Sequence, residues 1–314
     1  MSHYLLLLAL PAIFLGWTLG YNNMSAIFGP PVVAGIIKYR TSTILAAIFI
    51  ILGTIIGGSA GMKTVSSIAS TGVIMAVSAS LGTAIVVLVL SAFSLPVSIT
   101  QGIAGALIGI GIVNHTTQWG IVEKIITMSV IAPFGAIVIA YLTHKTVSVF
   151  YNRIGSIRVK GTFVRLFSLS VGIYTAYSFG ADNVANITGP FIGAEMFNVQ
   201  QALIFGAAAM ALGVLTSSKK VIYTVGSGIT VLEPFDAAIA LFSEASTLLI
   251  FSIIGVPISS VQAIVGAVIG VGLVKGTRMI DSKTLIRIIS GWIVTPIATG
   301  TIAVIIYSIL KIWR

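Results

Sequence analysis

Long apolar stretches, interrupted by short polar segments with Gly or Pro, recur along almost the whole chain. About 20 apolar residues in a row are enough for a helix to cross the hydrocarbon core of a bilayer. Hydrophobic residues make up 57% of the 314 residues and charged residues only 8%, whereas a soluble domain carries roughly 25% charge. The sequence therefore predicts an all-α polytopic protein of the cell membrane.

The net charge of +10 comes from 17 Lys and Arg against 7 Asp and Glu. In a soluble protein such a balance would suggest nucleic acid. Here the basic residues cluster at the ends of apolar segments, where they set orientation and contact lipid headgroups. We therefore expect membrane lipids as partners and no nucleic acid. The chain has no cysteine, so thiolate metal sites and disulfides are excluded.

Two blocks of sequence occur twice, in the same order. Residues 20–34 (GYNNMSAIFGPPVVA) match residues 180–194 (GADNVANITGPFIGA), and residues 95–111 (LPVSITQGIAGALIGIG) match residues 256–272 (VPISSVQAIVGAVIGVG). Chance similarity between apolar helices would not preserve both order and spacing. The pattern predicts a duplicated unit.

We expect one membrane repeat over residues 1–145, a basic connecting loop over 146–163 and a second repeat over 164–314. Apolar segments are predicted in the first repeat near 4–20, 24–38, 41–60, 71–93, 96–113 and 124–143. Their counterparts are predicted near 164–180, 184–198, 199–217, 235–255, 257–274 and 285–310.

Basic residues indicate that the repeats are inverted. The loop after the second segment carries Lys38 and Arg40 in the first repeat, but Asn198 and Gln200 in the second. The loop before the last segment shows the opposite bias, with most of its basic residues in the second repeat. Because basic loops stay cytoplasmic, equivalent loops should lie on opposite faces. This arrangement implies an odd number of crossings per repeat, about five, with one short, broken or re-entrant segment among the first two.

The connecting loop should be cytoplasmic and both termini non-cytoplasmic. The basic residues of the loop and its flanks are Lys145, Arg153, Arg158, Lys160 and Arg165.

Four short motifs combine a helix breaker with side chains that favour helix N-caps: 20–23 (GYNN), 96–98 (PVS), 180–183 (GADN) and 257–260 (PISS). A helix that begins inside the membrane exposes unpaired N–H groups and the positive end of its dipole, which suit an anion. Non-helical backbone at that depth is tolerated only where it is buried or lines a cavity. We expect the four starts to converge on one site near the midplane.

Two GxxxG pairs, Gly105 with Gly109 and Gly266 with Gly270, favour close helix packing over ligand contact. Asp182 lies in an apolar stretch with no basic residue nearby, and membrane carboxylates are costly and usually functional. Asp182 therefore suggests a cation-binding or substrate-binding role. Glu244, midway along its segment, could be a proton or cation site or could hydrogen-bond another helix.

No Lys or Arg occurs within the four motifs, so an anion drawn there needs neutralising by helix dipoles and by co-bound cations. This favours cation-coupled symport with Na⁺ or H⁺. No nucleophile–base pair, phosphate-cradling ATP loop or His-based metal site is visible, so we expect neither an enzyme nor a metal site beyond bound Na⁺.

At these motifs the chain resembles the inorganic phosphate transporter (PiT) family, which also includes sulfate permeases. The matching stretches are GADNVANITGP, LPVSITQGIAGALIG and VPISSVQAIVGAVIG, and the likeness covers both halves. It implies Na⁺- or H⁺-coupled phosphate uptake and a homodimer. The residues to which it assigns substrate contacts are Asn22, Asn23, Ser98, Thr100, Asp182, Asn183, Ser259 and Ser260. With Glu244 added, the candidate coupling-ion residues are Asn23, Asp182, Asn183 and Glu244.

The chain departs from the family pattern at several of these positions. Asn22 and Asn23 stand where the family has an Asn-Asp pair, and Asp182 and Asn183 reverse its order. Gln101 and Gln262 replace a histidine. One acid in place of two weakens the preference for protonated phosphate, which can donate a hydrogen bond to a carboxylate, over sulfate, which only accepts. Phosphate stays the first expectation, sulfate the second, and an anion channel or a non-transporting sensor the third.

Overall fold

The computed structural model describes residues 3–33, 35–70, 72–92, 97–217, 232–276 and 282–312. These residues are helical throughout, apart from turns and one isolated antiparallel bridge between Ala69 and Thr117. The helices are α1 (His3–Val33), α2 (Tyr39–Gly57), α3 (Ser59–Ser66), α4 (Val73–Ala92), α5 (Ile99–Val113), α6 (Trp119–Arg153), α7 (Ile157–Gly193), α8 (Val199–Thr216), α10 (Pro234–Ile254), α11 (Ser260–Lys275) and α12 (Ser282–Ile312).

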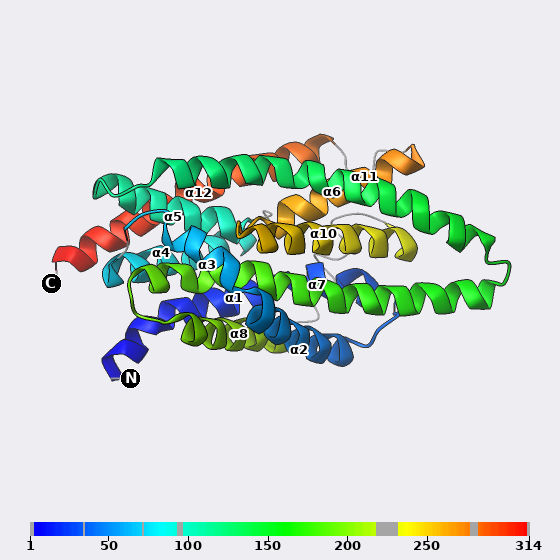
Figure 1. The fold of residues 1–314 in the computed structure, drawn as a ribbon, viewed down its shortest axis with the longest axis horizontal. Helices are drawn as coiled ribbons and strands as arrows, with labels where there is room; N and C mark the ends of the chain where they lie inside the picture. Colours follow the sequence, from blue (N-terminus) through cyan, green and yellow to red (C-terminus); the bar gives the residue numbers. More distant parts are fainter. Residues whose placement is uncertain are drawn as a thin grey trace.

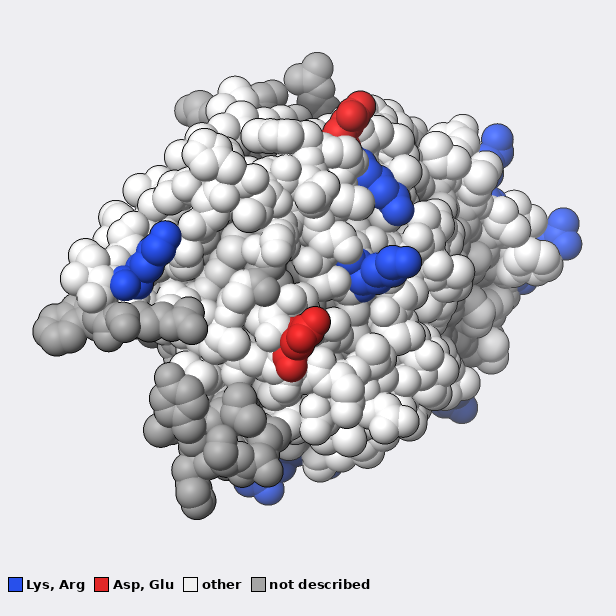
Figure 2. All heavy atoms as spheres, turned by 60° about the vertical axis from the view of Figure 1, so that its left-hand side comes forward, with Lys and Arg blue, Asp and Glu red and all other residues white. Residues whose placement is uncertain are grey.

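Six of these helices are long and apolar enough to cross a membrane: α2, α4, α6, α8, α10 and α12. Their outward faces carry large apolar side chains such as Ile253, Ile286 and Ile297, which are 74%, 68% and 65% exposed. On the face seen in Figure 2, a few charged side chains lie on a surface that is otherwise made of uncharged residues. A surface of this kind is matched by lipid rather than by water, which confirms the polytopic membrane protein predicted from the apolar runs.

The helices of the two halves follow one another in matching order. Each half has a long helix (α1, α7), a helix of membrane length (α2, α8), a helical hairpin (α4–α5, α10–α11) and a second long helix (α6, α12). The hairpins each pair a helix of about membrane length with a shorter one, α5 or α11. Pro133 lies inside α6 and Pro296 inside α12. The duplication seen in the sequence is thus also a duplication of helix order.

Packing between the halves is reciprocal. Helix α1 packs on α8 and α7 packs on α2, while α5 packs on α12 and α11 packs on α6. A Cβ at Gly20 of α1 would meet the Met210 carbonyl of α8, and one at Gly180 of α7 would meet the Ile50 carbonyl of α2. Each half therefore completes its core with helices of the other half.

The predicted packing role of the GxxxG pairs is confirmed. Gly105 and Gly109 of α5 lie against Pro296 and Gly300 of α12. In the equivalent place, Gly266 and Gly270 of α11 lie against Pro133 and Ile137 of α6. The missing side chains let the backbones approach closely, as small residues do between membrane helices.

Equivalent long helices run in opposite directions along the molecule (Figure 1). The two termini lie at one end and the turn between α6 and α7 at the other. The α4–α5 hairpin enters from the end of the termini and the α10–α11 hairpin from the opposite end, and their inner ends approach each other near the centre. The centre of the molecule is therefore where short helices begin.

Two of the four predicted helix starts are wrong. The motifs at 20–23 and 180–183 lie within the continuous helices α1 and α7, so the paired segments 4–20 with 24–38, and 164–180 with 184–198, each form one helix. The glycines serve close packing, and the asparagine amides bond back to their own helices. Asn23 Nδ2 donates to the Leu19 carbonyl at 2.9 Å, and Asn183 Nδ2 to the Phe179 carbonyl at 3.1 Å.

The stretch 146–163, predicted as a loop, is also mostly helical. Helix α6 continues to Arg153 and α7 begins at Ile157, leaving only a three-residue connection. Aromatic contacts stiffen the two polar helix ends: Tyr151 stacks on Phe235 of α10 with ring centroids 4.3 Å apart and contacts Phe163 of α7 at 5.9 Å. Polar helix ends that pack on each other can extend beyond the apolar part of the helix.

Candidate functional site

The inner ends of both hairpins begin with a serine cap, as predicted. Ser98 precedes α5 and its Oγ accepts a hydrogen bond from the Gln101 backbone N–H at 3.2 Å. Ser259 precedes α11 and its Oγ accepts from the Gln262 backbone N–H at 3.3 Å. Both serines are buried. Two helix N-termini thus lie inside the molecule, where a helix presents the positive end of its dipole and N–H groups that have no partner within the helix.

Three hydrogen bonds join these helix starts to each other and to the middle of α7. The Thr100 hydroxyl donates to the Ile258 carbonyl at 2.9 Å, which connects the two hairpins directly. Asn186 Nδ2 of α7 donates to Thr100 Oγ1 at 2.9 Å. The Ile258 backbone N–H donates to Asp182 Oδ1 at 3.2 Å. Helix α7 therefore holds the start of α5 through Asn186 and the start of α11 through Asp182.

Asp182 is an incompletely satisfied carboxylate. It is 1% exposed, and its Oδ2 atom has no hydrogen-bond partner among the described residues. None of the ion pairs found in the described residues involves it. An ionised carboxylate buried in this way is costly unless a proton or a cation neutralises it. Asp182 therefore requires a proton or one compensating positive charge.

Other oxygen atoms near these helix starts lack partners as well. Asn186 Oδ1 and the side-chain carbonyl oxygens of Gln101 and Gln262, in the first turns of α5 and α11, are buried with no partner among the described residues. Carbonyl and carboxylate oxygens are the ligands of hard cations. The unpaired N–H groups of the helix starts suit an anion. Groups suited to an anion and groups suited to a cation thus occur at the same pair of helix starts.

Not every predicted residue joins this network. Thr100 is hydrogen-bonded to Asn186 of α7, and Asp182 of α7 to the Ile258 N–H just before α11, whereas Ser98 and Ser259 cap their own helices. Asn183 Oδ1 accepts weakly from Asn186 at 3.4 Å. Ser260 is buried in the first turn of α11. The hydrogen bonds found in the described part of the chain do not connect the remaining three candidates, Asn22, Asn23 and Glu244, to the network.

Those three residues lie on the helices that surround the network. Asn22 and Asn23 are half-buried on α1, and Asn22 Nδ2 has no partner among the described residues. Glu244 is buried on α10, with Oε2 likewise unpartnered. Both helices pack against α7. An amide donor and a second acid are thus available on neighbouring helices.

Asn186 was not among the residues predicted from the sequence. It lies one helical turn after Asp182, so the two side chains share a face of α7. Its equivalent in the first half is Ala26, so a search for residues shared by both repeats passes over it. The spacing of the two polar residues in GADNVAN was the available signal.

The sequence comparisons agree with this architecture. The family model described as the phosphate transporter family matches residues 19–161 and again residues 153–303. The chain is 30% identical over 296 residues to the protein named Putative phosphate permease MJ0630 of Methanocaldococcus jannaschii, covering 94% of each chain. It is 26% identical over 308 residues to the sulfate permease CysP of Bacillus subtilis, covering 95% of this chain and 86% of that one.

Among solved structures, one named "The sodium-dependent phosphate transporter" has the same fold, with a TM-score of 0.88. The match covers 99% of this chain and 100% of that one at 20% identity. In the described residues no group of three or more His, Cys, Asp or Glu could hold a metal ion. With both halves matched by one family model, the chain belongs to the phosphate transporter family and is a multi-pass transport protein of the cell membrane rather than an enzyme.

Proposed function

We propose that this protein is a cation-coupled secondary transporter that takes up inorganic phosphate, bound between the starts of α5 and α11. One observation carries the proposal: a buried carboxylate, Asp182, lies hydrogen-bonded to the start of α11, where that start meets the start of α5. Two dipole ends attract the anion, while the carboxylate requires a cation. Each ion therefore makes the site more favourable for the other.

The anion would be held without a basic side chain. The two serine hydroxyls, Thr100 and the free N–H groups of the first turns are its proposed donors. The Asn22 amide and the Ser260 hydroxyl would complete the set of hydrogen-bond donors around the anion. The phosphate permease names among the relatives support phosphate as the first substrate.

The coupling ion would sit beside Asp182 Oδ2. We propose Na⁺ with the amide oxygens of Asn183 and Asn186 among its ligands; the structural neighbour, which is sodium-dependent by name, supports this choice. A proton on Asp182 or on Glu244 is the alternative. Asn23 would contribute to a second cation position by its equivalence to Asn183. Because the membrane potential opposes anion uptake by about 2.3 kcal/mol per charge per 100 mV, co-transported cations are needed.

Sulfate is the second candidate. Asn22 offers an amide donor at the position equivalent to Asp182, and this donor is unpartnered among the described residues. A donor suits a fully ionised oxyanion, whereas a second carboxylate would favour a protonated one. The likeness to a sulfate permease supports this alternative.

Uptake in proteoliposomes separates the candidates. Labelled phosphate or sulfate is offered under an imposed Na⁺ or H⁺ gradient. A phosphate symporter accumulates phosphate above its external concentration; a sulfate symporter accumulates sulfate instead. A channel only dissipates an anion gradient, and a sensor moves neither anion.

We further propose that the two repeats are inverted in the membrane, with the α6–α7 turn in the cytoplasm. Arg40 and Gln200, exposed at equivalent positions early in α2 and α8, provide the test. A cysteine at Arg40 should react with an impermeant thiol reagent from the cytoplasm, and one at Gln200 from outside. Reaction of both from one face would exclude the inverted arrangement. The homodimer implied by the family resemblance is a separate proposal, which cross-linking in the membrane tests.

A further inference from the structure

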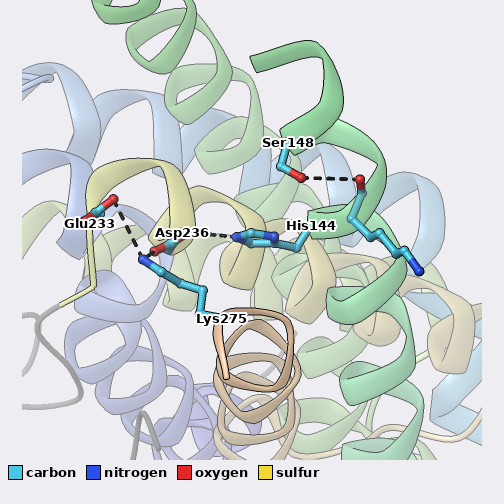
Figure 3. A network of polar contacts seen from close by, with 6 residues as sticks. His144, Ser148, Glu233, Asp236 and Lys275 are labelled. Atoms are coloured by element: carbon cyan, nitrogen blue, oxygen red, sulfur yellow. Dashed lines mark hydrogen bonds and ion pairs between the residues drawn. The ribbon is translucent and has the colours of Figure 1, made fainter. Parts of the chain in front are cut away.

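A cluster of charged groups lies at the outer end of the second hairpin, away from the site. The Asp236 carboxylate is 2.9 Å from His144 Nε2 through Oδ1 and accepts a hydrogen bond from Lys275 Nζ at 2.6 Å through Oδ2. Figure 3 shows the lysine and the imidazole approaching this carboxylate from two different helices. Asp236 is 2% exposed, and each of its oxygens has a partner within the protein.

The positions of these residues make the cluster a clamp. Asp236 lies in the first turn of α10 and Lys275 is the last residue of α11, so their hydrogen bond closes the base of the hairpin. His144 lies on α6, the helix of the first repeat on which α11 packs. We call His144, Asp236 and Lys275 the basal clamp. It ties the hairpin that carries Ser259 at its inner end to the other repeat.

Glu233 is not an essential part of the clamp. Its carboxylate is 3.8 Å from Lys275 Nζ and its side chain is 76% exposed. Exposed ion pairs of this kind contribute little. The Lys275 side chain is 32% exposed, so it can leave Asp236 and extend toward water or headgroups.

The first hairpin has a neutral pair in the equivalent place. Asn114, directly after α5, corresponds to Lys275, and Tyr307 of α12 corresponds to His144. The Tyr307 hydroxyl donates to Asn114 Oδ1 at 3.0 Å. Met75 stands at the position of Asp236 and is buried. Two equivalent hairpin bases are thus fastened by different chemistry.

We propose that the basal clamp is the latch of the cytoplasmic gate: it holds the base of the α10–α11 hairpin closed against α6, and it must separate before the anion site opens to the cytoplasm. This inference rests on the transport function and membrane orientation proposed above. Packed helices switch between discrete arrangements rather than deforming continuously. A hairpin fastened at its base by one carboxylate provides such a two-state element.

The absence of natural cysteines makes the latch directly testable. Ser260→Cys, in the first turn of α11 and 7% exposed, serves as the reporter. Its reaction with a membrane-impermeant thiol reagent is measured in vesicles of known orientation, from each face and without anion. Asp236→Asn in this background keeps the shape of the side chain and removes its charge. Tyr307→Phe is the matched control at the other hairpin base.

The latch predicts that Asp236→Asn raises the labelling rate from the cytoplasmic face about tenfold or more, the scale of losing a hydrogen bond between charged groups. Labelling from the outer face should not rise, and Tyr307→Phe should leave the cytoplasmic rate at the parent value. His144→Phe, which spares the Asp236–Lys275 bond, should raise the cytoplasmic rate by a smaller factor, and it serves as the test if Asp236→Asn does not fold.

Unchanged cytoplasmic labelling in a folded clamp variant would overturn the latch, as would an equal rise from both faces, which indicates general loosening. Because the assay needs no transported anion, it can fail or succeed independently of the proposed function. If the clamp variants show the expected labelling pattern but the natural, cysteine-free protein accumulates neither phosphate nor sulfate, the transport proposal alone is refuted.

Discussion

The α4–α5 and α10–α11 hairpins share their architecture but differ in charge. Each presents a serine-capped short helix to the centre and packs that helix, through two glycines, on a proline-containing helix of the other repeat. Two carboxylates of the second repeat have uncharged equivalents in the first: Asp182, bonded to the start of α11, corresponds to Asn22, and Asp236 at the hairpin base corresponds to Met75. The duplication gives both hairpins the same frame, and the second repeat supplies both of these carboxylates.

The largest effect should come from removing the negative charge of Asp182, whose equivalent in the first repeat is the neutral Asn22. Asp182→Asn should lower cation-coupled uptake by about 100-fold or more, since a hydrogen bond to a charged group contributes up to ~3 kcal/mol, and it should leave the protein folded. Initial rates of labelled anion uptake, compared with a matched Asn22→Ala variant, provide the measurement. Full cation-coupled uptake by folded Asp182→Asn would show that the Asp182 carboxylate is not needed for coupling.

The shared architecture predicts similar costs at equivalent glycines. Gly105→Leu and Gly266→Leu each place a side chain against the backbone of a proline, and each should destabilise the protein by about 1–3 kcal/mol. Thermal unfolding of the two variants and the natural protein in detergent measures the loss of stability caused by each substitution. A loss confined to one variant would show that the hairpins are not packed equivalently.

An acid introduced at position 22, the equivalent of Asp182 in the first repeat, should strengthen the preference for phosphate over sulfate. Asn22→Asp should shift the uptake ratio toward phosphate over sulfate by about tenfold, because a protonated phosphate can donate to the new carboxylate and sulfate cannot. Competition between the two labelled anions measures the ratio. The matched variant Asn22→Ala, which removes the amide without adding a carboxylate, is the control. A shift toward sulfate would exclude a direct contact between residue 22 and the anion.

The smallest effect concerns pH at the charged hairpin base. The hydrogen bond from Lys275 to Asp236 raises the pKa of Lys275, more than partial burial lowers it, and the nearby Asp236 and Glu233 carboxylates add to the rise. A raised folded-state pKa means that the contribution of Lys275 is complete below the ordinary lysine pKa and is lost only as the pH rises through the higher value.

Cytoplasmic labelling of the Ser260→Cys reporter should therefore be flat from about pH 8 to about pH 10, once corrected for thiolate formation with a model thiol. If the labelling rate rises within that range, and does not rise in the Asp236→Asn background, Lys275 loses its proton at a lower pH than its hydrogen bond to Asp236 implies.

The sequence predicted those features that depend on local pattern. Apolar runs located the membrane helices, and Pro-x-Ser motifs located the caps Ser98 and Ser259. The predicted breaks at Gly20 and Gly180 were wrong, because local breaker signals do not show that a glycine is packed against a carbonyl of another helix. Tertiary packing there outweighs the intrinsic preference for a break.

The clamp could not be predicted, since His144 and Asp236 are 92 residues apart and no short-range pattern connects them. The same holds for Thr100 and Ile258, which are 158 residues apart. Such contacts follow from the reciprocal packing of the repeats, and the duplicated sequence blocks do not specify which helix of one repeat meets which helix of the other.

The most direct test is to locate the anion itself. Crystals grown with Na⁺ and arsenate, or selenate as the sulfate analogue, would give an anomalous peak from the central atom of the oxyanion. We expect that peak between Ser98 and Ser259, with Asp182 facing the cation that accompanies the anion. A fully occupied peak elsewhere, with the starts of α5 and α11 empty, would contradict it.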